Sequence, residues 1–190
     1  YRSFRMPFQN CIYNVRKLSV AIRICILVYQ IQEPIQIETK LGCAISSIEA
    51  NMNDTKQTIG VIGLGSMGFG VAQSALRAGH TVHGFDINPA QVERFQAEGG
   101  ASGTLDEVAG DLDTVVVIVL NAAQTESVLF GPDGIAPKMP SGAAILSCAT
   151  VAPEFARDME RRCAEIGLLY LDAPVSGGTG RAASGELSVM

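Results

Sequence analysis

The stretch from Thr58 to Gly79, TIGVIGLGSMGFGVAQSALRAG, decides the fold that we expect for this chain. It begins with a β-branched apolar run, Ile59–Ile62, which predicts a buried strand. The sequence GLGSMG (63–68) follows at once, and a helical pattern then continues to Gly79. A GxGxxG motif between a strand and a helix is typical of a dinucleotide-binding turn, whereas the same motif elsewhere carries little information.

We call residues Gly63–Gly68 the glycine turn. Its three glycines have separate mechanical roles in that interpretation. Gly63 permits the tight turn, Gly65 lets the backbone approach a pyrophosphate, and Gly68 lets the helix lie close to the strand. The amides of the first helical turn and the positive end of the helix dipole then face the anion. An ordinary strand–helix turn is the alternative interpretation.

An acidic residue stands where the motif needs one. The run Thr81–Phe85 predicts a second strand, and Asp86 follows it, 23 positions after Gly63. A carboxylate at about this spacing, roughly 20 residues, accepts the ribose hydroxyls of NAD and would repel the 2′-phosphate of NADP. Ile87 next to it offers no guanidinium for such a phosphate. NAD is therefore the predicted cofactor, and NADP is less favoured. The alternative interpretation of Asp86 is an acidic residue in the turn before the next helix.

Strand and helix patterns continue to alternate after Asp86. We expect helices over residues 89–98, 124–129 and 153–166, a short helical turn over 104–109, and strands over 114–120, 143–146, 168–171 and 187–190. Unbroken apolar runs such as TVVVIVL (114–120) are typical of parallel strands buried on both faces. This alternation predicts an α/β fold with a doubly wound parallel sheet of the Rossmann type.

Ligands of such sheets bind beyond the carboxyl ends of the strands. Besides the glycine turn and Asp86, this rule selects Leu120-Asn121, Thr150 and the serine turn (Ser176-Gly177-Gly178). The hydroxyl and successive amides of the serine turn could bind an anion. Asn121 and Thr150 have a competing interpretation as helix N-caps, and the serine turn has one as a flexible connection.

The composition narrows the classes of function. The 190 residues are 47% hydrophobic and 17% charged, with a net charge of −5, which indicates a globular protein without a basic surface for nucleic acid. No GxxxxGK[ST] motif is present, so a P-loop nucleotide site is excluded. The five cysteines show no CxxC pair and no metal-ligand spacing. This pattern indicates a reducing compartment, the cytoplasm, and predicts no metal site.

The first 51 residues differ from the rest of the chain. They carry six Lys/Arg against three Asp/Glu, whereas residues 52–190 carry eight against sixteen. The apolar run Leu18–Ile31 contains Arg23 and is too short to span a bilayer, so no membrane association is expected. We interpret residues 1–51 as an extension outside the functional fold and residues 52–190 as the NAD-binding domain. A mitochondrial transit segment and a secretory signal are the alternatives for the extension.

Two motifs resemble those of the β-hydroxyacid dehydrogenases, the 3-hydroxyisobutyrate dehydrogenase-like enzymes. GVIGLGSMGFGVAQSALRAGH is similar to their cofactor signature and LDAPVSGGTGRAASGELSVM to their substrate-loop signature, and the resemblance covers about residues 56–190. The run VLNAAQTESVLFG looks most like the L-threonate dehydrogenase branch. The resemblance implies NAD-linked oxidation of a small 3-hydroxy or sugar acid such as L-threonate, by an enzyme that is a homo-oligomer at full length.

The resemblance also implies roles for individual residues. The glycine turn (Gly63, Leu64, Gly65, Ser66, Met67 and Gly68) would hold the pyrophosphate and Asp86 the adenosine ribose; Leu120, Asn121 and Thr150 would line the nicotinamide end; Ser176, Gly177 and Gly178 would hold the substrate carboxylate.

No catalytic residue is expected within this sequence. The general acid/base lysine of the family belongs to a later GxxGxxxKxxxN motif, which this sequence does not contain, so the resemblance implies a lysine beyond Met190. The resemblance also implies an all-helical second domain, which we do not expect within this sequence.

Three expectations follow from this departure. The chain should bind the cofactor without turnover, its last strand (187–190) should lack a covering surface, and it should be poorly soluble when expressed alone. A non-catalytic dinucleotide-binding module is the alternative from another class of function. A semialdehyde or imine reductase of the same superfamily is the alternative among enzymes.

Overall fold

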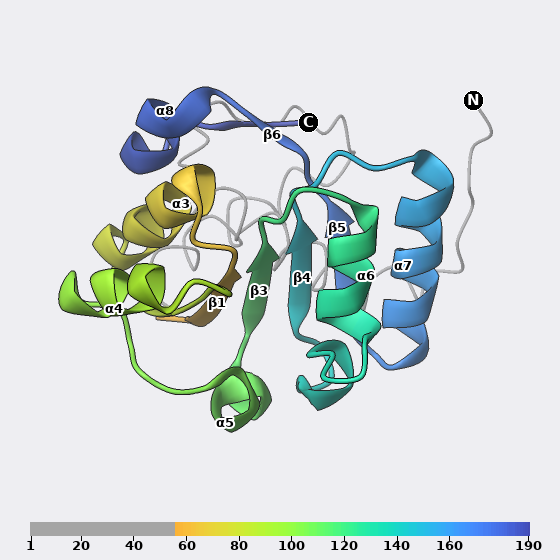
Figure 1. Cartoon of the computed structure of the whole chain (residues 1–190). Coiled ribbons are helices and arrows are strands. Elements are labelled where there is room, and N and C mark those ends of the chain that lie inside the picture. Colours follow the sequence, from red (N-terminus) through yellow and green to blue (C-terminus); the bar gives the residue numbers. More distant parts are fainter. Residues whose placement is uncertain (1–55) are drawn as a thin grey trace, which may run out of the picture.

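A computed structural model of the chain describes residues 56–190, which contain one five-stranded parallel sheet (Figure 1). The strands are β1 (Thr58–Ile62), β2 (Thr81–Phe85), β3 (Thr114–Val117), β4 (Ala144–Ser147) and β5 (Leu169–Asp172), in the spatial order β2-β1-β3-β4-β5. The predicted parallel α/β sheet is thereby confirmed. The interpretations of residues 1–51 fall outside the described residues and stay predictions.

Helices cover both faces of the sheet, as a doubly wound fold requires. One face carries α3 (Ser66–Arg77), α4 (Pro89–Ala97) and α8 (Gly178–Ser184); the other carries α5 (Leu105–Val108), α6 (Ala122–Phe130) and α7 (Pro153–Glu165) (Figure 1). Short 3₁₀ turns at Ala109–Asp111 and Ala136–Lys138 lead into β3 and β4.

Alternate strand residues divide the core into two layers, because successive side chains of a strand point to opposite faces. Val61 and Val116 pack on the α3 side, in one cluster with Phe95 of α4. Val115 and Ile145 pack on the α6 side, in a second cluster. All five side chains are fully buried. Burial on both faces explains why these strands read as continuous apolar runs.

The strand register brings the carboxyl ends of the sheet to one level. Ile62 at the end of β1 pairs with Phe85 and Val117, the last residues of β2 and β3. Val117 in turn pairs with Ser147, the last residue of β4. The segments that follow these strands therefore share one edge of the sheet, where the predicted site residues lie.

One predicted strand is longer than the observed one. The predicted strand 114–120 ends at Val117, because β1 turns away at Gly63. The amide of Ile118 makes the last bond to β1, to Ile62 O at 2.8 Å. Residues 118–120 therefore leave the sheet and run along its carboxyl edge.

The predicted last strand, 187–190, is also shorter in the structure. It is only β7 (Ser188–Val189), which pairs antiparallel with β6 (Val175–Ser176). Leu187 is buried in the α3-side cluster, so the expectation of an uncovered last strand is wrong for this side chain. Met190 lies outside β7 and is 71% exposed, although its amide donates to Pro174 O at 2.9 Å. The expectation therefore holds for the side chain of Met190 and not for the segment as a whole.

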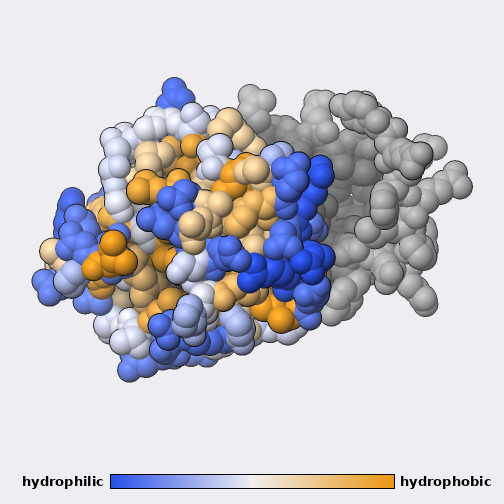
Figure 2. Space-filling model, turned by 45° about the vertical axis from the view of Figure 1, so that its right-hand side comes forward, coloured by the Kyte–Doolittle hydropathy of each residue, from blue (hydrophilic) through white to orange (hydrophobic). Residues whose placement is uncertain are grey.

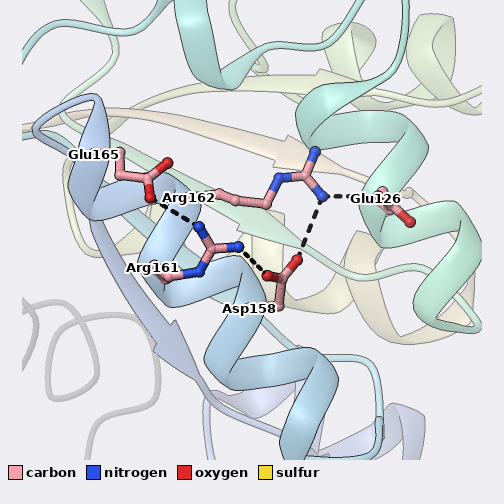
Figure 3. A network of polar contacts seen from close by, with 5 residues as sticks. All are labelled: Glu126, Asp158, Arg161, Arg162 and Glu165. Atoms are coloured by element: carbon pink, nitrogen blue, oxygen red, sulfur yellow. Dashed lines mark hydrogen bonds and ion pairs between the residues drawn. The ribbon is translucent and has the colours of Figure 1, made fainter.

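A charged network ties α6 to α7 (Figure 3). Arg162 pairs with Glu126 of α6 at 2.7 Å and with Asp158 at 3.7 Å, and its guanidinium lies 4.1 Å from the centre of the Phe130 ring. Arg161 pairs with Asp158 and Glu165 within α7. Figure 2 shows hydrophilic side chains gathered on the face where α7 lies. The network holds together the two helices that follow β3 and β4.

Within residues 56–190, no helix is both long and apolar enough to cross a membrane. The same residues contain no cluster of three or more His, Cys, Asp or Glu side chains placed to hold a metal ion. Cys148 and Cys163 are buried, as expected for small apolar side chains, and burial raises the pKa of Cys163 to about 11.

Candidate functional site

Gly63 starts the site at the end of β1, an interior strand that lies between β2 and β3. Its φ of +97° lies in the left-handed region that favours glycine, and its amide donates to Phe85 O at 2.8 Å. A Cβ at Gly63 would overlap the carbonyl oxygen of Ile118, which follows β3. The turn is thus wedged between the ends of the two neighbouring strands, and no other residue fits at its first position.

Gly65 and Gly68 differ in what surrounds them. A Cβ at Gly65 would meet no protein atom within 4 Å, so this position faces open space. A Cβ at Gly68 would overlap the carbonyl oxygen of Gly63, so α3 can begin close to the turn only because residue 68 has no side chain. The open and the crowded glycine match the two roles that the motif assigns, approach of a ligand and close packing of the helix.

The amino end of α3 is open to a ligand as well. Gly65 is its N-cap residue and supplies no side-chain hydrogen bond. The first helical bond runs from the amide of Phe69 to Gly65 O at 2.9 Å, so the amides before Phe69 precede the helical ladder. Such amides, together with the helix dipole, can bind an anion like a pyrophosphate.

Asp86 points at the glycine turn. One carboxylate oxygen accepts a hydrogen bond from the amide of Leu64 at 2.7 Å, and the other accepts one from the amide of Asn88 at 2.8 Å. The second bond makes Asp86 a turn acid as well, while the N-cap of α4 is Asn88, whose side chain accepts from the amide of Ala90. Asp86 therefore holds the glycine turn by a hydrogen bond and places its carboxylate beside that turn.

The predicted site residues that follow β3 and β4 differ in their structural roles. Asn121 caps α6, since its side-chain oxygen accepts from the amide of Gln124 at 3.0 Å, so the capping interpretation is confirmed. Leu120 is 86% exposed and projects from the carboxyl edge. Thr150 is exposed in the loop before α7 but does not cap that helix, because the N-cap residue is Ala152. The capping interpretation is wrong for Thr150.

The serine turn lies on β6 and the start of α8, on the same side of the sheet as α3. Ser176 is exposed, and Gly177 and Gly178 have φ values of +140° and +76°. A Cβ at Gly178 would meet nothing within 4 Å, so its backbone is accessible. The structure brings this turn near the glycine turn through α8, which packs against α3.

A pocket of about 410 Å³ lies between the glycine turn and α8. Gly65 and Ser66 of the glycine turn, Arg94 of α4, and Thr179 and Ala183 of α8 contribute to its lining. Arg94 was not predicted as a site residue; its guanidinium lies 4.2 Å above the Phe69 ring and 3.5 Å from Glu98. Only the tertiary packing of α4 on α3 brings it there, so no local sequence signal could have identified it.

Two further residues that lie at this edge were not predicted as site residues. Ile87, directly after Asp86, is fully exposed although it is a large apolar side chain. Asp172 ends β5 opposite Ser147, and partial burial raises its pKa. A single exposed apolar side chain does not by itself indicate a ligand surface, and the sequence alone does not show which apolar residues stay exposed.

A parallel sheet of this order, with a side-chain-free turn after its first strand and a carboxylate bonded to that turn, defines a Rossmann-type dinucleotide-binding domain. The comparison with known families agrees. The chain belongs to the family of the NAD binding domain of 6-phosphogluconate dehydrogenase, whose model matches residues 58–190.

Curated relatives support the resemblance drawn from the motifs. The chain is 53% identical over 135 residues to the L-threonate dehydrogenase of Cupriavidus necator, covering 70% of this chain and 46% of that protein. It is 41% identical over 133 residues to the 3-hydroxyisobutyrate dehydrogenase of Pseudomonas aeruginosa, covering 68% and 44%. The chain thus spans about half the length of the curated relatives it matches.

Solved structures share the fold. The 3-hydroxyisobutyrate dehydrogenase from Salmonella typhimurium superposes with a TM-score of 0.67 at 43% identity, covering 71% of this chain and 47% of that one. Psf3, solved in complex with NADP⁺, superposes with a TM-score of 0.64 at 25% identity, covering 69% and 47%. This family therefore binds nicotinamide dinucleotides.

Proposed function

We propose that residues 52–190 form the cofactor-binding half of an NAD-dependent dehydrogenase that oxidises a small hydroxy acid such as L-threonate. The observation that supports it most is the carboxylate of Asp86 bonded to the amide of Leu64 at 2.7 Å, beside the open Gly65. The relatives named L-threonate dehydrogenase support the choice of substrate.

The preference for NAD over NADP rests on charge. A 2′-phosphate next to Asp86 would bring two negative groups together. The next residue, Ile87, has no charge to compensate for this repulsion. The cation that lines the pocket, Arg94, is already paired with Glu98 and stacked on Phe69. The two ribose hydroxyls of NAD, by contrast, can donate hydrogen bonds to the Asp86 carboxylate.

The exposed apolar residues at the sheet edge complete the proposed cofactor site. Ile87 follows β2 and Leu120 follows β3, on opposite sides of β1 and its turn. We assign Ile87 to the adenine, next to the ribose acid, and Leu120 to the nicotinamide end together with Asn121 and Thr150. Covering these side chains with the flat rings of a cofactor removes apolar surface from water and so favours binding.

In the reaction, bound NAD supplies the acceptor for the hydride that leaves the hydroxyl-bearing carbon of the substrate. The hydroxyl of Ser176 and the amides of Gly177 and Gly178 are suited to orient the substrate carboxylate by hydrogen bonds. Ser176 is exposed, and Gly178 has no protein atom near its α-carbon hydrogens, so both are accessible to a small acid.

The group that takes the hydroxyl proton lies beyond Met190 in this proposal, outside the described residues. Within residues 56–190 the lysines are Lys56 and Lys138, and both precede strands, at the edge of the sheet opposite the site. Lys138 is held there by Asp106 at 2.6 Å and by the backbone oxygen of Asp133. A lysine that acts as general base must reach the substrate within hydrogen-bond distance.

Titration of the protein with NADH and NADPH tests the cofactor assignment. We expect NADH to bind more tightly, and Asp86→Asn to weaken NADH binding about tenfold or more while narrowing the difference between the two cofactors. Asp111→Asn, in an exposed 3₁₀ turn away from the carboxyl edge, is the matched control. Tighter binding of NADPH by the unmodified protein, or an unchanged NADH affinity in Asp86→Asn, would refute the assignment.

The substrate assignment needs the enzyme at full length. We expect kcat/KM for L-threonate to exceed that for 3-hydroxyisobutyrate by about tenfold or more, the scale that one additional hydrogen-bonded hydroxyl can provide. Equal values for the two acids would leave the dehydrogenase assignment standing and overturn the choice of L-threonate.

A further inference from the structure

Helix α3 is enclosed between two close contacts that glycines make possible. Gly68 and Gly70 are two positions apart, which places them about 200° apart around a helix, on opposite faces. Gly68 lies against the turn at Gly63, as described above. A Cβ at Gly70 would lie 2.7 Å from the amide nitrogen of Ala183 and 2.8 Å from the carbonyl carbon of Ala182, both in α8.

The contact at Gly70 involves backbone, so it cannot be relieved by turning a side chain. Ala182 is almost completely buried and belongs to the same apolar cluster as Phe69 and Val71 of α3. The guanidinium of Arg77, about two helical turns further along α3, donates to the backbone oxygen of Ala183. Helix α8 is thus attached to α3 at two points, and Figure 1 shows it lying alongside that helix.

The two ends of this contact lead to the two turns of the site. The amino end of α3 is the glycine turn, and the amino end of α8 follows the serine turn directly. The pocket between the glycine turn and α8 is lined by Gly65 and Ser66 on one side and by Thr179 and Ala183 on the other. A ligand that restricts the motion of α3 at the glycine turn would therefore also restrict α8 and the serine turn that precedes it.

We propose that Gly70 is a positioning residue, which fixes α8 against α3 so that occupation of the glycine turn by a dinucleotide orders the serine turn for the substrate acid. This inference rests on the proposed function, because it assumes that the glycine turn binds the cofactor. It adds a residue outside the GxGxxG motif and a mechanical link between the two halves of the site. Without the close approach at Gly70, α8 would lie further from α3, and the separation of the two turns would change.

Hydrogen exchange of the full chain, with and without saturating NADH, tests the link. In the unmodified protein we expect NADH to slow exchange of the amides of both the glycine turn and α8 by about tenfold. In Gly70→Ala the slowing at the glycine turn should remain at saturating NADH, while the slowing in α8 is lost.

Gly180→Ala is the matched control, because a Cβ there, in α8 itself, would meet nothing within 4 Å. It should keep the response of α8 to NADH. Should Gly70→Ala fail to fold, Arg77→Gln removes the second attachment without adding volume. This variant should lose part of the slowing of amide exchange that NADH causes in α8. An unchanged α8 response in both Gly70→Ala and Arg77→Gln overturns the inference, as does an equal loss in Gly180→Ala.

The outcomes also separate this inference from the proposed function. If NADH protects the glycine turn but not α8 in the unmodified protein, the cofactor assignment stands and the link through Gly70 is wrong. If NADH protects neither segment, both the cofactor assignment and the link are wrong.

Discussion

The glycine turn and the serine turn both lead from a strand into a helix, but they are built differently. The glycine turn follows a strand that is buried in the middle of the sheet, and backbone surrounds it on two sides. The serine turn follows β6, a strand of two residues whose only partner among the described residues is β7. Its neighbours are ends of side chains: a Cβ at Gly177 would lie 3.1 Å from Arg181 Cδ and from Leu187 Cδ2.

This difference separates a preformed region from an adaptable one. Backbone that is held by two neighbouring strands cannot shift without breaking sheet hydrogen bonds, so the glycine turn has its binding geometry before a ligand arrives. Side chains such as Arg181 can change rotamer at small cost, so the serine turn can adjust. Under the proposed function, this difference places a rigid cofactor site beside an adaptable substrate site, which would suit a family whose members act on different acids.

Among the substitutions that test this difference between the two turns, Gly63→Ala should cause the largest loss of stability. Alanine at φ +97° is strained, and its Cβ would overlap the oxygen of Ile118, so the free energy of unfolding should fall by about 3 kcal/mol or more. Gly79→Ala is the control, since it has a similar φ of +91° but open space around it and should cost only about 1 kcal/mol. Chemical denaturation measures both; equal losses would contradict a rigidly enclosed turn.

A smaller loss is expected from Gly177→Ala in the serine turn. The positive φ of Gly177 strains alanine, but the neighbouring side-chain atoms of Arg181 and Leu187, at 3.1 to 3.2 Å, need to give way by only a few tenths of an ångström, so the free energy of unfolding should fall by about 1 to 2 kcal/mol. We expect this loss to be clearly smaller than that of Gly63→Ala in the same denaturation assay. A loss as large as that of Gly63→Ala would show that the serine turn is equally rigid.

A loss of about 1 kcal/mol in the free energy of unfolding is expected from Asp86→Asn without ligand, because asparagine offers one acceptor oxygen for the two amides of Leu64 and Asn88. The thermal midpoint should fall accordingly. Asp111→Asn again provides the control. An unchanged midpoint for Asp86→Asn would indicate that the carboxylate serves only the ligand and does not hold the glycine turn.

The smallest effect is a pH dependence from His80, which supports the strand that carries the glycine turn. Its Nδ1 accepts from the amide of Gln57, just before β1, and burial lowers its pKa below 6.5. The unfolded state then binds the proton more readily, so this contribution to stability is complete above pH 6.5 and declines as the pH falls from there toward the folded pKa. The slope for one proton cannot exceed about 1.4 kcal/mol per pH unit.

Replacing the titrating group checks this expectation. The substitution His80→Asn keeps an acceptor for the Gln57 amide, but the amide side chain cannot take up a proton in this range. Denaturant midpoints of the variant should therefore lose the decline that begins at pH 6.5 in the unmodified protein. A decline of the same size in the variant would assign it to other groups.

The strand–helix alternation and the geometry of the glycine turn were predictable because they depend on local pattern. Apolar runs identify β1 and β4 wherever they pack, and the glycine turn needs the same backbone in any Rossmann sheet. The early end of β3 could not be predicted, since it depends on where its neighbour turns at Gly63. The contact of Gly70 with α8 joins residues more than 100 positions apart, so no local signal could reveal it.

One short contact at the border of the sheet has a consequence for self-association. Beyond α4 the chain runs back beside β2, where Ala101 forms a single parallel bridge with His83 and its amide donates to Val82 O at 2.8 Å. One rung of a ladder is too little to count as a sixth strand, yet it occupies the hydrogen-bonding row that an incoming chain would need. Strand addition between molecules at this border would first have to displace residue 101, and that requirement protects the sheet from pairing edge to edge there.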